Sequence, residues 1–275
     1  MSVSTTSATP VAVVTGSSSG IGRATALALG RAGYAIVLHA RRNIVGLQQV
    51  AQELRSTGLE NAPQTLCLTG DIACPQTCND LVRAVFAWQG RVDAWINNAG
   101  ADVLTGRARR QAFEARLQRL LAVDVQGTVR LSRLVASRMA SQPPIPTEKC
   151  KSDGGASGHI INMGWDQATL GMEGEPGQLF GTTKAAVAAF SSSLALTYPN
   201  IRVNCIAPGW IRTEWGQTAA AEYWAQRAED ESLQARWGLP EDVAQLMVWL
   251  VSDASRFING QTIAVNGGRR YYPRG

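Results

Sequence analysis

Short apolar runs alternate with stretches of helical periodicity along most of the chain. The runs at 11–15, 35–39 and 159–163 are mainly aliphatic and are predicted strands. Segments 43–57 and 106–139 carry apolar residues at helical spacing. Apolar strands joined through helices are typical of a parallel sheet that is covered on both faces. The pattern predicts an α/β fold, a doubly wound parallel sheet in a single domain.

Three stretches lack this pattern and are predicted to lie outside the regular elements. Residues 1–10 have neither a basic start nor an apolar run, so they indicate a disordered tail rather than a signal peptide. Residues 141–158 are polar and rich in Pro and Gly, which predicts an inserted surface loop. The domain is expected to span 11–268, and a C-terminal tail is expected at 269–275.

The composition restricts the class of protein. At 275 residues, with 45% hydrophobic and 17% charged residues, the chain suits one globular domain. The net charge of +5 comes with dispersed Arg residues rather than a clustered stripe, so we expect no nucleic-acid partner. Five Cys residues without CxxC spacing argue against a disulfide framework or a zinc site. No apolar run reaches about 18 residues, so we expect no membrane span and a cytoplasmic protein.

The stretch VAVVTGSSSGIG, residues 11–22, carries the first candidate chemistry. A strand ends there at a glycine turn and an Ala- and Leu-rich helix follows, which is the context of a phosphate-binding turn. Gly16 permits the tight turn, Gly20 lets the backbone approach a pyrophosphate, and Gly22 lets the helix pack near the strand. The implied ligand is a dinucleotide. Its predicted contacts in this turn are Gly16, Ser18, Ser19, Gly20, Ile21 and Gly22.

The end of the second predicted strand bears on the choice of dinucleotide. An acid at this position accepts a hydrogen bond from the 2′-OH of NAD, whereas an Arg matches the 2′-phosphate of NADP. Here Ala40 takes the place of the acid, and Arg41 and Arg42 follow it. Because a guanidinium suits a phosphate, we expect NADP(H) rather than NAD as the cofactor. The alternative is that Arg41 and Arg42 are two solvent-exposed charges that bind no ligand.

Further motifs accompany the glycine turn, whose spacing is TGxxxGxG. Residues 97–100 read NNAG, and residues 208–213 read PGWIRT, which fits PGxIxT. These motifs resemble those of the short-chain dehydrogenases/reductases (SDRs), and the resemblance covers nearly the whole chain. It implies an oxidoreductase that moves a hydride between a nicotinamide cofactor and a small-molecule substrate.

The resemblance also implies roles along the cofactor. Asp71 would bind the adenine amino group with help from the backbone of Ile72, although Asp71 equally suits the N-cap region of a helix starting at Pro75. The wall under the adenine ring would be formed by Asn98, Ala99 and Gly100. The turn over the nicotinamide would be formed by Pro208, Gly209, Ile211 and Thr213.

Two larger features are implied as well. Segment 213–237, which contains Trp215, Trp224 and Trp237, corresponds to the substrate-covering lid of the family. Family members commonly pair two helices into dimers and tetramers. The resemblance therefore implies a homo-oligomer, such as a homotetramer.

The predicted centre departs from the family pattern. Asp124, within VDVQGT, stands where the family has Asn. Gly164 and Trp165 stand where it commonly has two Ser, and Phe180 replaces the Tyr of YxxxK. In a family member the Lys lowers the pKa of the Tyr and holds the nicotinamide ribose, and the Tyr passes a proton to the substrate. Phe180 has no proton to pass, whereas Lys184 is retained and can still hold the ribose.

Two functions follow from this altered centre. The first is a reductase for a C=O or C=N bond that needs no phenolic proton. Pteridine reductases of the same family resemble the chain in the insertion, in the letters IINM and in an Asp soon after them. Asp166 is then a candidate proton donor, because burial beside Trp165 would raise its pKa, and a capped turn would explain Asp166 equally well. Weaker candidates are Asp102, Asp124, Glu173 and Glu175.

The second function is that of a cofactor-binding protein with weak or no catalysis, either a sensor or a partner subunit of an SDR oligomer. The groups that bind the dinucleotide are retained, whereas the groups that relay a proton are not. Trp residues near the site suit a flat aromatic substrate and suit an ordinary core nearly as well. The retained nicotinamide turn and lid favour the reductase.

Overall fold

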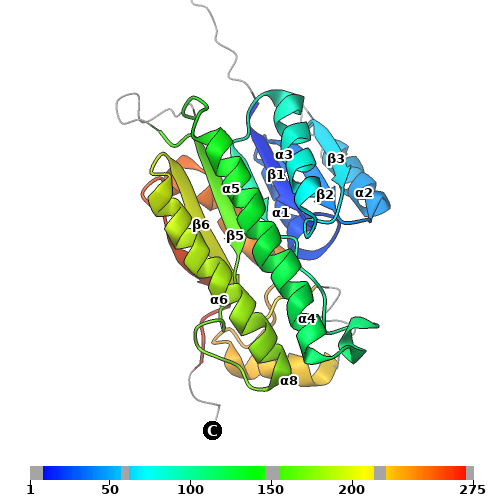
Figure 1. Ribbon diagram of the computed structural model, residues 1–275. Coiled ribbons are helices and arrows are strands. Elements are labelled where there is room, and N and C mark those ends of the chain that lie inside the picture. The colour runs from blue at the N-terminus through cyan, green and yellow to red at the C-terminus, as the bar shows by residue number, and fades with distance from the viewer. Residues whose placement is uncertain (1–8, 57–61, 146–154, 214–220, 271–275) are drawn as a thin grey trace, which may run out of the picture.

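One parallel sheet forms the centre of the protein (Figure 1). The computed structural model describes residues 9–56, 62–145, 155–213 and 221–270. These residues form a seven-stranded sheet in the order β3–β2–β1–β4–β5–β6–β7, with every neighbouring pair parallel, which confirms the predicted fold class. The strands are β1 (Val11–Thr15), β2 (Ala35–Ala40), β3 (Thr65–Thr69), β4 (Ala94–Asn97), β5 (Gly158–Met163), β6 (Ile201–Pro208) and β7 (Thr262–Val265).

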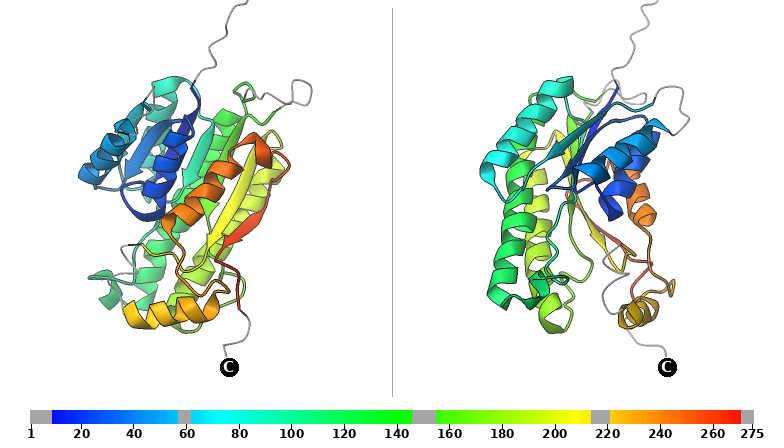
Figure 2. Two further views of the ribbon diagram at one scale, coloured as in Figure 1. Left: turned by 180° about the vertical axis from the view of Figure 1, so that it is seen from behind. Right: turned by 90° about the vertical axis from the view of Figure 1, so that its right-hand side faces the viewer.

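Helices cover both faces of this sheet (Figure 2). Val13 and Val14 of β1 point to opposite faces and join separate apolar cores, as alternation along a strand requires. Because both faces of the sheet are covered, the inner strands β1 and β2 are fully buried and almost entirely apolar, whereas the edge strands β3 and β7 are partly exposed. The first core includes helices α1 (Gly20–Arg31), α2 (Ile44–Arg55) and α9 (Pro240–Leu250). The second includes helices α3 (Pro75–Gln89), α5 (Thr128–Met139) and α6 (Gly174–Thr197).

The helical segment predicted at 106–139 is not one regular helix. A short 3₁₀ turn, η1 (Ala108–Arg110), precedes α4 (Phe113–Leu120), and a π-helical turn, η2 (Leu121–Gly127), connects α4 to α5. π-turns inside helices are rare and frequently lie at functional sites. Here the π-turn contains Asp124, which it directs toward the carboxyl end of β4.

The packed domain is slightly longer than predicted. At its start the Pro10 carbonyl accepts a hydrogen bond from the Ala35 N–H (2.8 Å). At its end Arg270 N–H donates to the Glu231 carbonyl (2.8 Å), so residues 269–270 pack on the domain instead of belonging to a tail. Glu231 is the last residue of α8 (Ala221–Glu231). A 3₁₀ turn, η3 (Asp253–Ser255), follows α9. The predicted loop at 141–158 ends one residue early because Gly158 already belongs to β5, and its middle lies outside the described residues.

The topology fixes where a ligand can bind. The strand order reverses between β1 and β4, and ligands of open α/β sheets bind at the carboxyl ends of the strands near such a switch point. At this end, α4, α8 and the first turns of α6 extend beyond the sheet (Figure 1). Within the described residues, α6 alone is long and apolar enough to cross a membrane. Core helices of folded domains pass the same test, and α6 packs on β5 and β6.

Candidate active site

The glycine turn between β1 and α1 borders a groove at the carboxyl edge of the sheet. Gly16 and Gly20 have φ angles of +68° and +53°, a left-handed conformation that favours glycine. A Cβ on Gly22 would lie 2.2 Å from the Gly16 carbonyl oxygen, so the packing of α1 on the turn admits no side chain there. The first turn of α1 has no acidic residue, and the Ser19 side chain makes no cap hydrogen bond. The positive end of this helix is therefore open to an anion.

A hydrogen-bonded clamp attaches the glycine turn to the end of β4. Thr15 Oγ1 accepts hydrogen bonds from the backbone N–H groups of Asn98 and Ala99 (both 3.0 Å). The side-chain amide of Asn98 donates to the carbonyls of Thr15 (3.0 Å) and Gly16 (3.1 Å). The NNAG motif thus holds the two loops of the groove together, in addition to lining it.

The groove has a volume of about 610 Å³ and collects most of the residues predicted to contact the cofactor. Arg41 and Arg42, at the end of β2, line it and are both exposed. Gly22, which the sequence also suggested, is buried beneath the turn instead of lining it. The predicted residues that line it are Gly16, Ser18, Ser19, Gly20, Ile21, Arg41, Arg42, Asp71, Ile72, Asn98, Ala99, Gly100 and Thr213.

The surroundings of Asp71 contain a residue that the sequence did not indicate. Asp71 Oδ1 accepts a hydrogen bond from the Ala73 N–H (3.0 Å), and Cys74 takes the N-cap position of α3. The second oxygen of Asp71 lies 3.4 Å from Arg119 Nη2 of α4, which also lines the groove. Arg119 lies 48 positions from Asp71, so no local motif connects them. Only the topology brings this third guanidinium to the groove.

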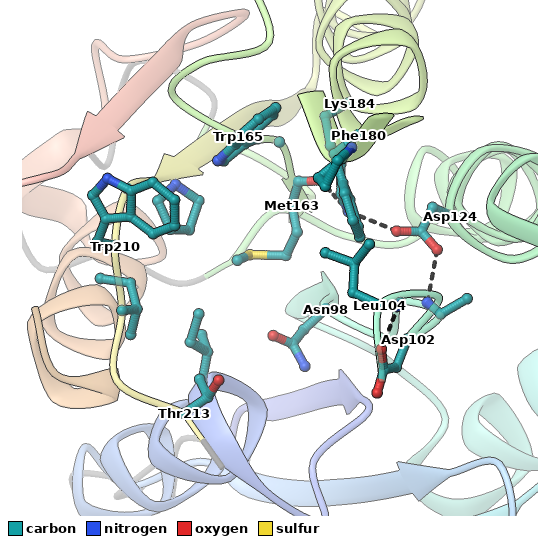
Figure 3. Close-up of a pocket in the computed structure, with 18 of the residues that line it drawn as sticks. Asn98, Asp102, Leu104, Asp124, Met163, Trp165, Phe180, Lys184, Trp210 and Thr213 are labelled. Atoms are coloured by element: carbon teal, nitrogen blue, oxygen red, sulfur yellow. Dashed lines mark hydrogen bonds and ion pairs between the residues drawn. The ribbon is translucent and has the colours of Figure 1, made fainter. Parts of the chain in front are cut away.

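Beyond the glycine turn the groove opens into a cleft of about 400 Å³ (Figure 3). Its walls are mainly apolar, and Trp165 meets Phe180 edge to face with ring centroids 6.3 Å apart. Trp210 and Trp237 form a second edge-to-face pair at 6.0 Å. The polar side chains that line the described part of the cleft are Asn98, Asp102, Asp124, Lys184 and Thr213. A cleft of this kind suits a small, flat and largely apolar molecule.

A buried ion pair lies at the wall of this cleft. Lys184 Nζ is 2.9 Å from Asp124 Oδ2 and donates to the Met163 carbonyl at 3.2 Å. The other oxygen of Asp124 accepts a hydrogen bond from the Ala101 N–H (2.8 Å), and Figure 3 shows both interactions of the carboxylate. The Asp124 side chain is 2% exposed and that of Lys184 13%. A Cβ at position 100 would lie 3.1 Å from Asp124 Oδ2, so Gly100 leaves room for the carboxylate.

The positions that depart from the family pattern face different surroundings. Phe180 and Trp165 line the cleft, so a phenyl and an indole ring stand where the family pattern has hydroxyl groups. A Cβ on Gly164 would lie 2.8 Å from Cys205 Sγ on β6, so a side chain at 164 would point into the sheet. Of positions 164 and 165, it is therefore Trp165 whose side chain faces the cleft. Among the described lining residues, Thr213 supplies the only hydroxyl.

Asp166 does not line the cleft, contrary to the expectation that it acts as a proton donor there. Its Oδ2 accepts a hydrogen bond from Asn266 Nδ2 (3.0 Å), and its N–H donates to the Pro208 carbonyl (3.2 Å). A Cβ on Gly209 would lie 3.1 Å from the same carboxylate oxygen. Burial raises the pKa of Asp166, as the sequence suggested, but the carboxyl group lies behind the Pro208–Gly209 turn. Its contacts support that turn.

Two of the weaker acidic candidates also lie outside the cleft lining. Glu173 pairs with Arg227 of α8 (2.5 Å), and Glu175 pairs with Arg116 of α4. These ion pairs attach the start of α6 to its neighbours. Asp102 does line the cleft, and its carboxylate accepts hydrogen bonds from the N–H groups of Leu104 (2.9 Å) and Thr105 (3.1 Å).

The segment predicted as a lid is anchored through Glu231 at the end of α8. Glu231 accepts hydrogen bonds from the Trp210 indole N–H (2.8 Å) and from Arg227 Nε (2.7 Å). The Arg227 guanidinium also stacks over Trp210, 5.8 Å from the ring centroid. These contacts place α8 and Trp210 together beside the cleft. Trp215 and the side chain of Trp224 lie outside the described residues, whereas Trp237 lines the cleft.

Comparison with known families agrees with this architecture. The family model described as enoyl-(acyl carrier protein) reductase matches residues 16–270. The chain belongs to the short-chain dehydrogenase/reductase family. The SDR structures it resembles share its single-domain Rossmann-like sheet. A short-chain dehydrogenase of Burkholderia cenocepacia, solved in complex with NADP, is 26% identical with a TM-score of 0.77, and the match covers 94% of this chain and 97% of that one.

Curated SDR relatives extend over the same length. The uncharacterized oxidoreductase YgfF of Escherichia coli is 30% identical over 94% of this chain and 99% of its own length. A 3-oxoacyl-[acyl-carrier-protein] reductase, FabG of Thermotoga maritima, is 29% identical over 94% of this chain and 96% of its own. The protein is therefore an oxidoreductase of the SDR type over its whole domain.

Proposed function

We propose that the protein is an NADP(H)-dependent SDR reductase that transfers a hydride to the C=N or C=O carbon of a small, flat substrate. The observation that carries the proposal is the continuous path from groove to cleft. The groove has a glycine turn and arginines at one end, and the cleft has aromatic walls and the Lys184–Asp124 ion pair. The NADP-bound structure of a relative supports the choice of cofactor.

The residues of the groove fit a dinucleotide phosphate. Gly16 and Gly20 adopt left-handed conformations without side chains, which leaves the backbone of the turn accessible to a pyrophosphate. Arg41 and Arg42 would bind the 2′-phosphate, and Asp71 and Ile72 the adenine. The nicotinamide would lie under Pro208, Gly209, Ile211 and Thr213, with Lys184 at its ribose. When bound, the reduced cofactor supplies the hydride.

We favour a C=N substrate, such as a pterin-like ring or a cyclic imine, over a simple ketone. The described cleft lining offers neither Tyr nor Ser, and a C=O bond depends strongly on such a donor because the alkoxide is a strong base. A C=N nitrogen takes up a proton more readily. The two Trp–aromatic pairs suit a planar ring that stacks.

The deciding experiment first measures the binding of NADPH and NADH to the purified protein by fluorescence. Ketones, cyclic imines and dihydropterins are then added, and oxidation of the cofactor is followed by absorbance. We expect tighter binding of NADPH than NADH, and turnover that is fastest with a C=N compound. Tighter binding of NADH would contradict the role of the arginines.

The loss of both hydroxyl donors supports a second candidate, a catalytically weak or inactive NADP(H)-binding sensor or partner subunit. Phe180 and Trp165 line the cleft with aromatic rings that carry no hydroxyl group. Tight NADPH binding without turnover of any compound in the panel would favour this candidate over the reductase.

We also propose a cytoplasmic homo-oligomer, a dimer or tetramer, built through α6. Only 33% of the most apolar window of α6 is buried within one chain. Four exposed positions in the middle of the helix are small and follow helical spacing, which would let a second copy approach closely. These exposed positions are Thr182, Ala186, Ala189 and Ser193.

A further inference from the structure

We infer that Arg119 is a further binding residue for the cofactor and contacts its adenine ring, an inference that rests on the proposed binding of NADP(H). Arg119 belongs to α4 and lines the groove, far in sequence from the glycine turn. Its Nη2 atom is 3.4 Å from Oδ2 of Asp71, which is proposed to bind the adenine. The guanidinium therefore lies at the part of the groove where the adenine would bind.

The wall that α4 and the π-turn contribute to the groove suits a flat ring. Arg119 and Val123 are four positions apart and both line the groove, so consecutive helical turns present them to the same space. Val123 and Ile72 are apolar lining residues that are nearly buried, with exposed fractions of 5% and 4%. A guanidinium beside apolar side chains suits a purine, because arginine stacks on aromatic rings.

The ion pair with Asp71 leaves most of the guanidinium free. Both side chains are about one-third exposed, and exposed ion pairs contribute little to stability. An arginine has five N–H donors, and among the described residues Asp71 is the only hydrogen-bonding partner of this guanidinium. The Asp71 carboxylate has acceptor sites beyond those used by Ala73 and Arg119, so it can still accept from an amino group. The pair thus offers adenine both a stacking plane and a hydrogen-bond acceptor.

The position of Arg119 separates its role from that of the other two arginines. Arg41 and Arg42 follow β2, whereas Asp71 follows β3, the neighbouring strand. Under the proposed function the 2′-phosphate binds at the first of these strand ends and the adenine at the second. Arg41 and Arg42 would then distinguish NADPH from NADH, whereas Arg119 would contribute equally to the binding of both.

The test measures the affinity of the purified protein for NADPH and for NADH by fluorescence titration, without substrate. Arg119→Met removes the guanidinium, and Arg119→Lys is the matched control that keeps the charge without the plane. Arg41→Met is the comparison for the 2′-phosphate. Arg119→Met is also made in an Asp71→Asn background, which separates direct contact with the cofactor from an effect through Asp71. Thermal unfolding of each variant without cofactor reports on folding.

We expect Arg119→Met to weaken NADPH and NADH by the same factor, about five- to thirtyfold, the size of a contact between a guanidinium and an aromatic ring. Arg119→Lys should lose nearly as much, because an ammonium group has no plane that stacks. Arg41→Met should weaken NADPH and leave NADH largely unchanged. In the Asp71→Asn background most of the Arg119→Met loss should remain. The melting temperature of Arg119→Met without cofactor should stay close to that of the parent, since the ion pair is exposed.

Other results would overturn the inference at different points. Unchanged affinity in Arg119→Met would exclude the contact, and full affinity in Arg119→Lys would show that only the charge matters. A loss confined to NADPH would make Arg119 a ligand of the 2′-phosphate. A loss that disappears in the Asp71→Asn background would make it a support for Asp71 alone. In each of these cases the proposed reductase would stand, whereas a parent protein that binds neither cofactor would overturn the proposed function, and this inference with it.

Discussion

At the scale of single residues, we propose that positions 180 and 124 are linked through Lys184, which pairs with Asp124. In the family pattern the Lys lowers the pKa of the Tyr, whereas here Lys184 is 2.9 Å from a buried carboxylate. A phenol placed at 180 would face a neutralised pair instead of a free cation. We propose that Phe180 and Asp124 act together, because Phe180 offers no phenol and Asp124 pairs with the charge of Lys184.

This coupling predicts that Phe180→Tyr alone gives only a small gain in ketone reduction, confined to high pH. Adding Asp124→Asn should free the Lys184 charge, lower the pKa of the introduced phenol and raise kcat/KM at neutral pH, by about 10²-fold if the phenol then acts as an acid catalyst. The measurement is the pH profile of kcat/KM for both variants. Identical profiles in the two backgrounds would show that Asp124 does not control this charge.

Asp166 gives a prediction of pH-dependent stability. Burial raises its pKa in the folded protein above the ordinary value of 3.8, so the folded state holds this proton more tightly than the unfolded state. Its contribution to stability is complete below that ordinary value and is lost as pH rises through the raised pKa. Asp166→Asn keeps an acceptor for Asn266 and has no charge to bury, so it should gain stability relative to the parent as pH rises from about 3 to 7.

Thermal unfolding of both proteins across this pH range tests the effect of Asp166→Asn. A stability difference that does not change with pH would show that ionisation of Asp166 is not responsible. Unchanged turnover in the variant would agree with the position of Asp166 outside the cleft, and a large loss of turnover would return it to the list of proton donors.

At the scale of elements, the glycine turn joins folding to cofactor binding. Gly22→Ala should destabilise the protein by about 1–3 kcal/mol and weaken NADPH binding, because the added Cβ meets the Gly16 carbonyl and the Asn98 amide. Gly181→Ala is the matched control, since a Cβ there has no neighbour within 4 Å and the residue lies inside α6. It should stabilise by about 0.5–1 kcal/mol. Denaturant unfolding and NADPH titration measure both effects, and equal stability of the two variants would contradict the assigned packing.

At this scale, some features of the fold and the site could be predicted from the sequence and others could not. The strands, the turn at Gly16 and the grouping of the residues predicted to bind the cofactor follow from local patterns, because backbone conformation and burial leave a mark on neighbouring residues. The ion pair between Asp124 and Lys184 joins positions 60 apart, and the π-turn that presents Asp124 has no sequence signature. The orientation of the Asp166 side chain could not be predicted either, since it depends on a hydrogen bond from Asn266, 100 positions away.

At the scale of the whole molecule, α6 links the site to the proposed oligomer. The helix presents Phe180 and Lys184 to the cleft, and its opposite face exposes small residues to the surroundings. A second copy packed on that face would cover α6 and hold its first turns in place. Binding of cofactor and assembly would then support each other, because both stabilise the same helix.

This arrangement predicts the effect of a charge on the outer face of α6. Ala186→Glu should convert the oligomer to smaller species, because two copies of the same carboxylate would meet in a close, largely apolar contact. Ala87→Glu, on the exposed side of α3, places the same charge away from α6 and should leave the mass unchanged. Light scattering after gel filtration, with and without NADPH, gives the mass of each variant. If both variants keep the parent mass, α6 is not the interface; if the parent is itself a monomer, the proposed assembly is wrong.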